Sequence, residues 1–86
     1  MDIGHRLKTI RLTLRLSQLE MGAKIGLSKQ GISKVENNKS FMTFQILSRL
    51  AVDLNINLNY LIAGIGEPFL KEHLKFEGDV KSSIMQ

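Results

Sequence analysis

The sequence predicts an all-α domain, a compact bundle of five short helices, and three observations support this fold class. Apolar residues recur at helical spacing in several segments, capping residues stand before most of these segments, and the 86 residues include only one proline. We expect one domain over residues 1–66, followed by a C-terminal extension over residues 67–86. A chain of this length has no room for a second domain, because domains typically contain about 100 to 150 residues.

The first two helices are predicted by an apolar stripe and by a capping box. The stripe repeats at helical intervals, at Ile3, Leu7, Ile10 and Leu14. The second helix begins at Ser17, whose hydroxyl can accept a hydrogen bond from the Glu20 amide while the Glu20 carboxylate reaches back to the Ser17 amide. This helix is short, because Gly26 offers the left-handed residue that ends helices at little cost.

The third helix is mostly polar, and the fourth is strongly amphipathic. Ser28 caps the third helix, which runs over residues 29–36, and Asn37-Asn38 ends it. Only Ile32 and Val35 form its apolar face. Thr43 caps the fourth helix, whose apolar positions are Ile46, Leu47, Leu50, Ala51 and Leu54.

Residues 54–60 alternate between apolar and polar side chains, a pattern that also fits a strand. The preceding residues offer no alternating partner, so we interpret Asn55 as a stop and Asn57 as the cap of a short fifth helix that ends at Gly64. Two alternatives stay open for the extension. Either a sixth helix begins with Pro68 at its first position, or residues 75–81 form a hairpin.

Composition argues against an enzyme, a metal site and a cofactor. The chain has no cysteine, and its two histidines, His5 and His73, have no clustered carboxylates beside them. No nucleophile stands beside an oriented base, and Gly64-Ile65-Gly66 lacks the buried strand that precedes a nucleotide loop. The acidic second residue and the lack of an apolar run of about 18 residues predict a cytoplasmic protein, bacterial or phage-encoded, with no membrane partner.

Positive charge is concentrated in the first three quarters of the chain. Residues 1–66 hold nine Lys or Arg against four Asp or Glu, a net +5, whereas residues 67–86 hold three Lys against four acids, a net −1. A polyanion partner for the basic part is one interpretation, and charge that serves only solubility is the other.

The second and third helices meet the requirements of a helix-turn-helix. Gly22 supplies a small residue where the helices cross, and Gly26 supplies the left-handed turn. Their shared inner face is expected at Met21, Ile25, Leu27, Ile32 and Val35. An ordinary helical hairpin in a small bundle is the alternative.

Short sequence pieces in a fixed order carry a family resemblance. They are Ile3-Gly4-His5-Arg6-Leu7-Lys8, Ile10-Arg11, Leu16-Ser17-Gln18, Ile25-Gly26-Leu27-Ser28, Ile32-Ser33-Lys34-Val35-Glu36-Asn37-Asn38-Lys39, Leu50-Ala51 and Asn59-Tyr60-Leu61-Ile62-Ala63-Gly64. In this order and spacing, residues 3–64 resemble the lambda-repressor-like helix-turn-helix domains of the Cro and repressor, or XRE, type. The resemblance implies a five-helix DNA-binding domain.

The resemblance also implies that the third helix lies in the major groove of double-stranded DNA. Its base-contacting residues would be Lys29, Gln30, Ser33 and Lys34, which suits the pairing of Gln with adenine and of Lys with guanine. Phosphate contacts would come from Arg6, Arg11, Ser17, Gln18, Ser28, Asn37, Lys39 and Ser40. The family often joins the positions of Arg11 and Glu36 in a structural ion pair.

Several residues depart from the family pattern. Arg15 replaces a common Gly after the first helix, Gly22 replaces a commoner Ala, and Gly31 lies inside the third helix. Each glycine inside a helix costs about 1 kcal/mol relative to Ala. Phe41 and Met42 stand where Pro and polar residues are frequent, and both a core position and an exposed contact remain open for them.

These observations together predict a sequence-specific transcriptional regulator, a repressor of phage or plasmid type that binds an inverted-repeat operator as a homodimer. Apolar residues in excess of a small core mark the expected dimer or partner surface, at Tyr60, Ile62, Ile65, Phe69, Leu70 and Leu74. The alternative is an antitoxin-like module whose C-terminal tail binds a toxin while the domain regulates its own operon.

Overall fold

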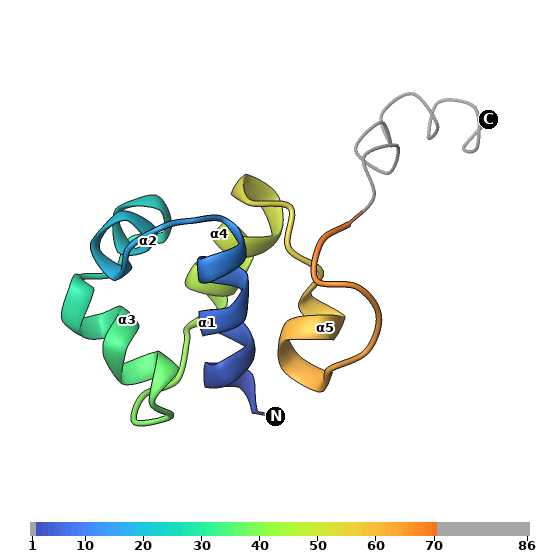
Figure 1. Cartoon of the computed structure of the whole chain (residues 1–86), viewed down its shortest axis with the longest axis horizontal. Coiled ribbons are helices and arrows are strands. Elements are labelled where there is room, and N and C mark those ends of the chain that lie inside the picture. Colours follow the sequence, from blue (N-terminus) through green and yellow to red (C-terminus); the bar gives the residue numbers. More distant parts are fainter. Residues whose placement is uncertain (1, 71–86) are drawn as a thin grey trace.

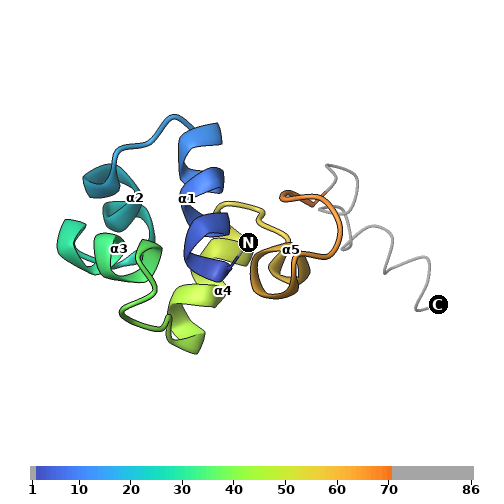
Figure 2. The same cartoon turned by 60° about the horizontal axis from the view of Figure 1, so that its bottom comes forward.

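The computed structural model describes residues 2–70 and confirms the all-α prediction. Its helices are α1 (Ile3–Thr13), α2 (Gln18–Ile25), α3 (Lys29–Glu36), α4 (Phe44–Asp53) and α5 (Leu58–Ala63). Figure 1 and Figure 2 show α1 near the middle, with α2 and α3 on one side of it and α5 on the other. The helix-turn-helix pair is therefore at one end of the described part.

Side-chain caps begin all five helices, as the sequence predicts for four of them. The caps Ser17, Ser28, Thr43 and Asn57 each accept a hydrogen bond from an amide in the following turn. The fifth cap is Asp2, which accepts from the His5 amide at 2.9 Å and which sequence analysis missed. That hydrogen bond, together with one from the Asn38 side chain, lowers the pKa of the Asp2 carboxyl group.

The turn between α2 and α3 depends on two glycines. Gly26 has a φ of 86°, the left-handed conformation that the sequence predicts, and the amides of Gly26 and Leu27 both donate to the Gly22 carbonyl at 2.8 and 2.9 Å. Gly22 is buried, and a Cβ atom there would overlap the Leu27 carbonyl oxygen. The close crossing of α2 and the turn therefore requires glycine at position 22.

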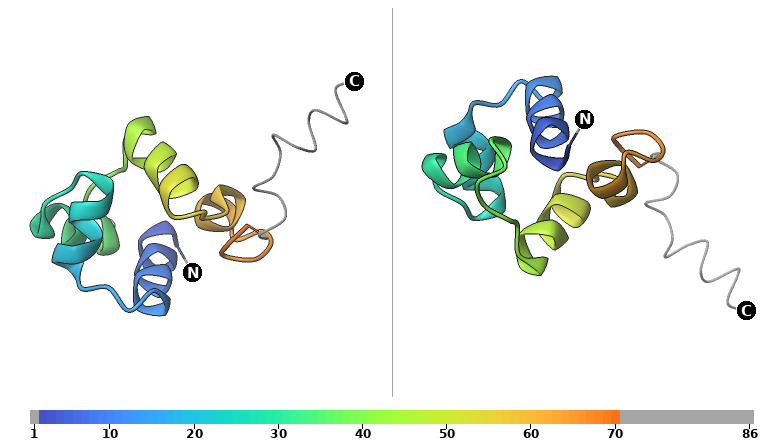
Figure 3. Two further views of the ribbon diagram at one scale, coloured as in Figure 1. Left: turned by 90° about the horizontal axis from the view of Figure 1, so that it is seen from above. Right: turned by 90° about the horizontal axis from the view of Figure 1, so that it is seen from below.

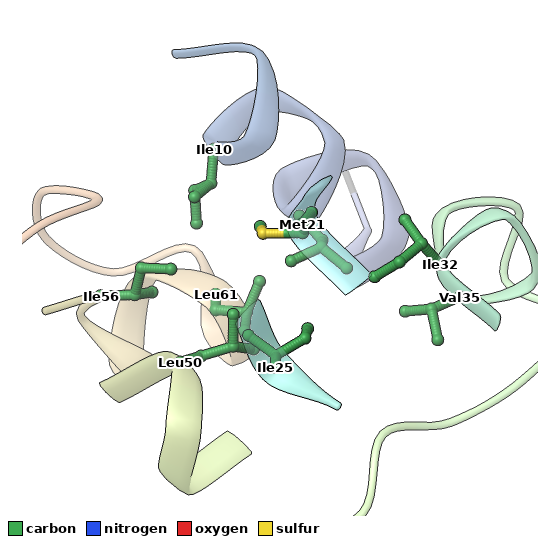
Figure 4. Packing of buried hydrophobic residues seen from close by; sticks show 9 residues of the cluster. Ile10, Met21, Ile25, Ile32, Val35, Leu50, Ile56 and Leu61 are labelled. Carbon is green, nitrogen blue, oxygen red and sulfur yellow. The ribbon is translucent and has the colours of Figure 1, made fainter. Parts of the chain in front are cut away.

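A single core joins the helices. Its fully or almost fully buried side chains are Leu7, Ile10, Met21, Ile25, Ile32, Val35, Leu50, Ile56 and Leu61, which come from every helix and from the segment before α5 (Figure 4). The predicted inner face of the helix-turn-helix belongs to this core, with Leu27 packed partly buried against it. Burial of α2 and α3 thus fixes which face of α3 remains outside.

Two departures from the family pattern lie in connections between helices, Arg15 before α2 and Met42 before α4, and the structure explains both. Arg15 adopts the left-handed conformation, with a φ of 60°, in the connection between α1 and α2. A glycine would take that conformation without steric cost, which accounts for its frequency at this position. Met42 is half-buried and packs against the core with Leu47, in the two positions of a hydrophobic staple around the Thr43 cap. Phe41, by contrast, is 96% exposed.

Residues 65–70 fold back onto the segment before α5, and this corrects one prediction. Ile56 and Phe69 form an antiparallel bridge, and the Asn57 amide donates to the Pro68 carbonyl at 2.8 Å. A sixth helix opening at Pro68 is therefore wrong, because Phe69 is extended and pairs with Ile56. Packing extends past the expected boundary at residue 66 to Leu70, whose amide donates to Asn55. The hairpin considered for residues 75–81 lies outside the described residues.

Candidate nucleic-acid interface

The outer face of α3 is polar and projects from the end of the molecule. Ile32 and Val35 are buried on the inner face, while Lys29, Gln30 and Lys34 are exposed on the outer one. Figure 2 shows α3 at the edge of the fold, with no helix outside it. The fourth predicted base contact, Ser33, is half-buried, and its hydroxyl accepts a hydrogen bond from the side-chain nitrogen Nδ2 of Asn37 at 3.4 Å.

The start of α3 is built from Ser28 and Gly31. The Ser28 hydroxyl accepts from the Gly31 amide at 3.0 Å, so this predicted phosphate contact is also the cap of α3. A Cβ atom at Gly31 would lie 3.3 Å from the Ser28 hydroxyl oxygen and 3.4 Å from a Leu27 methyl carbon. Packing within the protein therefore leaves nearly enough room for a methyl group at position 31, unlike at position 22.

A buried ion pair holds α3 to α1. Arg11 Nε lies 2.6 Å from Glu36 Oε2 and Arg11 Nη2 lies 3.1 Å from Glu36 Oε1, and each residue is only 8% exposed. The third nitrogen, Nη1, donates to the Leu16 carbonyl at 2.9 Å. The predicted ion pair of Arg11 and Glu36 is therefore present, and the buried guanidinium of Arg11 donates from all three of its nitrogens within the protein, a placement that does not favour the phosphate contact also expected of it.

Glu36 is also bound by Gln18 at the start of α2. The Gln18 side-chain nitrogen donates to Glu36 Oε1 at 3.1 Å. The Glu36 carboxylate of α3 therefore accepts hydrogen bonds from both α1 and α2 and joins the three helices. The sequence indicates the Arg11 partner but gives no sign of the Gln18 contact. We refer to Arg11, Gln18 and Glu36 as the Glu36 network.

The N-terminus of α2 is occupied by the side chain of Glu20. The Ser17 amide donates to Glu20 Oε1 at 2.8 Å, and the Ser17 hydroxyl accepts from the Glu20 amide at 3.0 Å. The capping box predicted from the sequence is thus present. It lowers the pKa of the Glu20 carboxyl group, because the Ser17 amide and then the Ser17 hydroxyl favour the charged form. Both groups of Ser17 that could meet a phosphate already have a partner.

Arg6 joins α1 to α5. Its Nε donates to the Leu61 carbonyl at 2.8 Å, and its Nη2 donates to the Ile62 carbonyl at 3.0 Å. These carbonyls belong to the last turn of α5, whose amide dipoles attract a cation. The structure therefore gives Arg6 a structural role that the sequence analysis, which expected a phosphate contact, did not foresee.

Exposed polar and basic residues follow the end of α3. Asn37, Lys39 and Ser40 are all exposed, and the Lys39 amide donates to the Lys34 carbonyl at 2.8 Å, which keeps this loop close to α3. Asn38 has a φ of 59° and accepts from the Gly4 amide at 3.2 Å. A Cβ atom at Gly4 would lie 2.5 Å from the Val35 carbonyl oxygen, so α1 meets the end of α3 at very close range.

One further cation, Arg49 of α4, was not singled out by sequence analysis. Its side chain is exposed and covers the turn between α2 and α3, since a Cβ atom at Gly26 would lie 2.8 Å from Arg49 Nη1. The sequence separates Arg49 from Gly26 by more than twenty residues, so only the folded structure shows that they are neighbours. Arg49 thus adds positive charge beside the helix-turn-helix.

The expected dimer or partner surface is only partly exposed. Tyr60 and Phe69 pack half-buried against the core, whereas Ile62 and Ile65 are exposed by 52% and 65% and Leu70 by 38%. Leu74 lies outside the described residues. Two of the expected contact residues therefore contribute to the fold itself.

The described part of the chain shows no other kind of site. Residues 2–70 contain no group of three or more metal-ligating side chains and no pocket. None of the helices in this part is long and apolar enough to cross a membrane. The outer face of α3 and its neighbouring loops are therefore the candidate interface.

Comparisons with known proteins agree with this geometry. The family model of the helix-turn-helix family HTH_3 matches residues 7–61. The "ImmF control region 10 kDa protein" of Bacillus phage phi105 is 34% identical over 59 residues, which cover 69% of this chain and 66% of that protein. The match thus spans slightly less than two thirds of that relative's length. Among solved structures, the P22 c2 repressor protein, crystallised in complex with the synthetic operator 9T in the presence of Tl+, gives a TM-score of 0.70 at 26% identity. This structural match covers 76% of the present chain and 98% of the P22 c2 repressor chain.

Proposed function

The chain belongs to the Cro- and repressor-type helix-turn-helix family, and on that premise we propose that it is a transcriptional repressor that reads double-stranded DNA by sequence. It binds an inverted-repeat operator with two copies and excludes RNA polymerase from the promoter. The relative from a phage control region and the similar repressor solved on an operator both support this proposal.

The observation that carries the proposal is the outer face of α3. Lys29, Gln30 and Lys34 are exposed along one side of the helix, while the Glu36 network and the core hold the other side in place. A fixed helix with exposed amide and amine groups suits the major groove, where Gln can bond adenine N6 and N7 and Lys can donate to guanine O6 and N7.

Phosphate contacts position such a helix and make binding depend on salt. Lys39, Ser40 and Asn37 in the loop after α3 are exposed and serve this role in the proposal, together with Ser28 at its start. Gln18 at the start of α2 is a further phosphate contact in the proposal, and its side chain also donates a hydrogen bond to Glu36. The slope of log K against log salt is about −0.9 for each phosphate that a Lys or Arg neutralises, so Lys39 contributes about −1 to the slope of one copy, and two copies double this contribution.

Gln30 and Lys39 distinguish base reading from phosphate contact. We expect Gln30→Ala to lower affinity for the preferred site about 5- to 150-fold and to relax the preference at one base pair, since a bidentate pair discriminates by about 1–3 kcal/mol. Lys39→Ala should weaken binding to all duplexes alike and reduce the slope of log K against log salt by about 1. Fluorescence anisotropy titrations at several salt concentrations measure both effects.

The control for these titrations is Asn59→Ala, an exposed amide side chain on α5, which should bind like the unaltered chain. If Gln30→Ala and Lys39→Ala change affinity equally for every duplex, α3 does not read bases and the proposed docking is wrong.

A further inference from the structure

Two phenylalanines form an exposed corner beside the end of α3. Phe41 is 96% exposed and Phe44 is 82% exposed, although Met42 between them packs against the core. We call Phe41 and Phe44 the aromatic corner. Figure 3 shows that the loop from α3 leads to the outer end of α4, where Phe44 begins the helix, whereas α5 lies at the other end of α4. Among residues 2–70, no side chain covers these two rings to any large extent.

We propose that the aromatic corner is the surface through which two copies of this chain contact each other when they occupy neighbouring half-sites of one DNA. The inference rests on the proposed function, because it requires two copies on one duplex. It differs from the sequence prediction, which put the dimer surface on α5 and the tail.

The chemistry of the corner favours protein over DNA as its occupant. Phenyl rings offer no donors to phosphate oxygens, and covering anionic oxygens with apolar groups removes their hydration without replacing it. Protein–DNA interfaces are polar and positively charged, whereas Phe is enriched at the centres of protein interfaces. Burial of two phenyl rings against a second protein surface is therefore the better use of this corner.

The size of the corner limits when the contact forms. An aromatic side chain buries roughly 150–250 Å², so two nearly free rings offer about 350 Å² from each copy. A pair of copies then buries about 700 Å² through these rings, whereas stable interfaces bury about 1,200–2,000 Å². The contact is therefore too small to hold a dimer in free solution.

Charge strengthens this dependence on DNA. Residues 37–52 around the corner include Lys39 and Arg49 and no acidic residue, so two free copies repel each other there. DNA phosphates neutralise such charges when both copies are bound. Binding to one duplex also replaces a bimolecular encounter by a high local concentration, in the millimolar range for short connections. The corner thus acts as a cooperative contact on DNA.

The position of the corner specifies how the two copies face each other. Recognition helices of a two-fold pair lie about one helical turn apart on one side of the duplex. The corner follows the C-terminal end of α3, so contact between two corners requires these ends to face the centre of the inverted repeat. Lys34 then reads base pairs nearer the centre than Gln30 does. The exposed apolar residues Ile62, near the end of α5, and Ile65, just after that helix, lie away from this meeting point.

The binding test compares two double variants on two duplexes. The duplexes are the inverted repeat enriched from a random library and the same duplex with one half-site scrambled. We expect the unaltered chain to bind the second half-site about 10- to 100-fold more tightly than the first, a typical coupling between sites. Phe41→Ser/Phe44→Ser should abolish this gain and leave binding to the scrambled duplex unchanged. The matched control, Ile62→Ser/Ile65→Ser, removes exposed apolar side chains from the end of α5 and the residues just after it and should keep the gain.

The absence of cysteine in the chain permits a direct test of proximity. With oxidised glutathione as the oxidant, Phe41→Cys should form a disulfide-linked pair on the inverted repeat, but not on the scrambled duplex or without DNA, while Leu12→Cys on α1 should form none. Equal cross-linking of both variants, or loss of cooperativity only in Ile62→Ser/Ile65→Ser, would overturn the inference. A fall in binding of the phenylalanine variant to the scrambled duplex would assign the corner to DNA instead. If the unaltered chain binds neither duplex, the proposed function fails, and this inference with it.

Discussion

Replacing Gly22 by Val is expected to abolish specific DNA binding and to lower the free energy of unfolding by about 3 kcal/mol or more, at the upper end of overpacking effects. A Cβ atom at position 22 overlaps the Leu27 carbonyl oxygen, which is backbone and cannot move without displacing the turn into α3. The amides of Gly26 and Leu27 both donate to the Gly22 carbonyl, so the same shift also strains the turn's hydrogen bonds. Thermal unfolding and operator titration measure the two losses.

The control for this prediction is Ala23→Val, in the next position of α2. Ala23 is exposed, so this variant carries the lower helix propensity of Val without the collision, and it should cost less than about 1 kcal/mol. A Gly22→Val variant that unfolds like Ala23→Val and still binds its operator would contradict the assignment of the helix-turn-helix crossing.

Breaking the pair of Arg11 and Glu36 is expected to be the second large effect. Arg11→Met or Glu36→Leu leaves one charged group buried without its main partner, which typically costs about 3–5 kcal/mol. The double variant replaces both groups by apolar ones and should cost clearly less than the two single changes together. Chemical denaturation of the four proteins gives this double-mutant cycle.

DNA binding by the same four proteins shows whether the ion pair only stabilises the fold or also positions α3. The double variant should fold yet bind its operator more weakly than the unaltered chain, because the ion pair fixes the end of α3 against α1. Lys8→Met, an exposed basic residue of α1, serves as the control and should change stability by no more than about 0.5 kcal/mol. Additive costs in the cycle, or unchanged operator binding by the double variant, would show that the pair does not position α3.

Local signals explain why most of the fold could be predicted from the sequence. Each cap at Ser17, Ser28, Thr43 and Asn57 is decided by residues within three positions of it, and each apolar stripe lies within a single helix. Gly26 was recognisable because its left-handed conformation belongs to the turn itself. The five helices therefore follow from interactions close in sequence.

Features that depend on contacts between distant segments were missed. Gly4 is required because α1 meets the carbonyls at the end of α3, and Arg6 binds carbonyls of α5 more than fifty positions away. The return of Phe69 to Ile56 and the hydrogen bond from Gln18 to Glu36 likewise appear only when separate segments are brought together. Sequence spacing gives residue types on a face, but it does not give the partner across the fold.

The candidate interface shows the same division. Lys29, Gln30 and Lys34 could be assigned to an outer face because periodicity puts Ile32 and Val35 on the inner one. The family resemblance implied both an ion pair with Glu36 and a phosphate contact for Arg11, and only the structure shows the burial of its guanidinium against Glu36. That Tyr60 and Phe69 pack against the core also required the structure, since apolar character does not distinguish a core position from a contact surface.

The most direct test of the central claim is selection from a random duplex DNA library with the unaltered chain at about 0.15 M salt, where purely electrostatic binding is weak. Sequence reading by the outer face of α3 predicts enrichment of an inverted repeat whose half-site centres lie about one helical turn apart, and loss of that enrichment with Gln30→Ala/Lys34→Ala. Retention of DNA without enrichment of any sequence, or the same enriched repeat from the double variant, would contradict it.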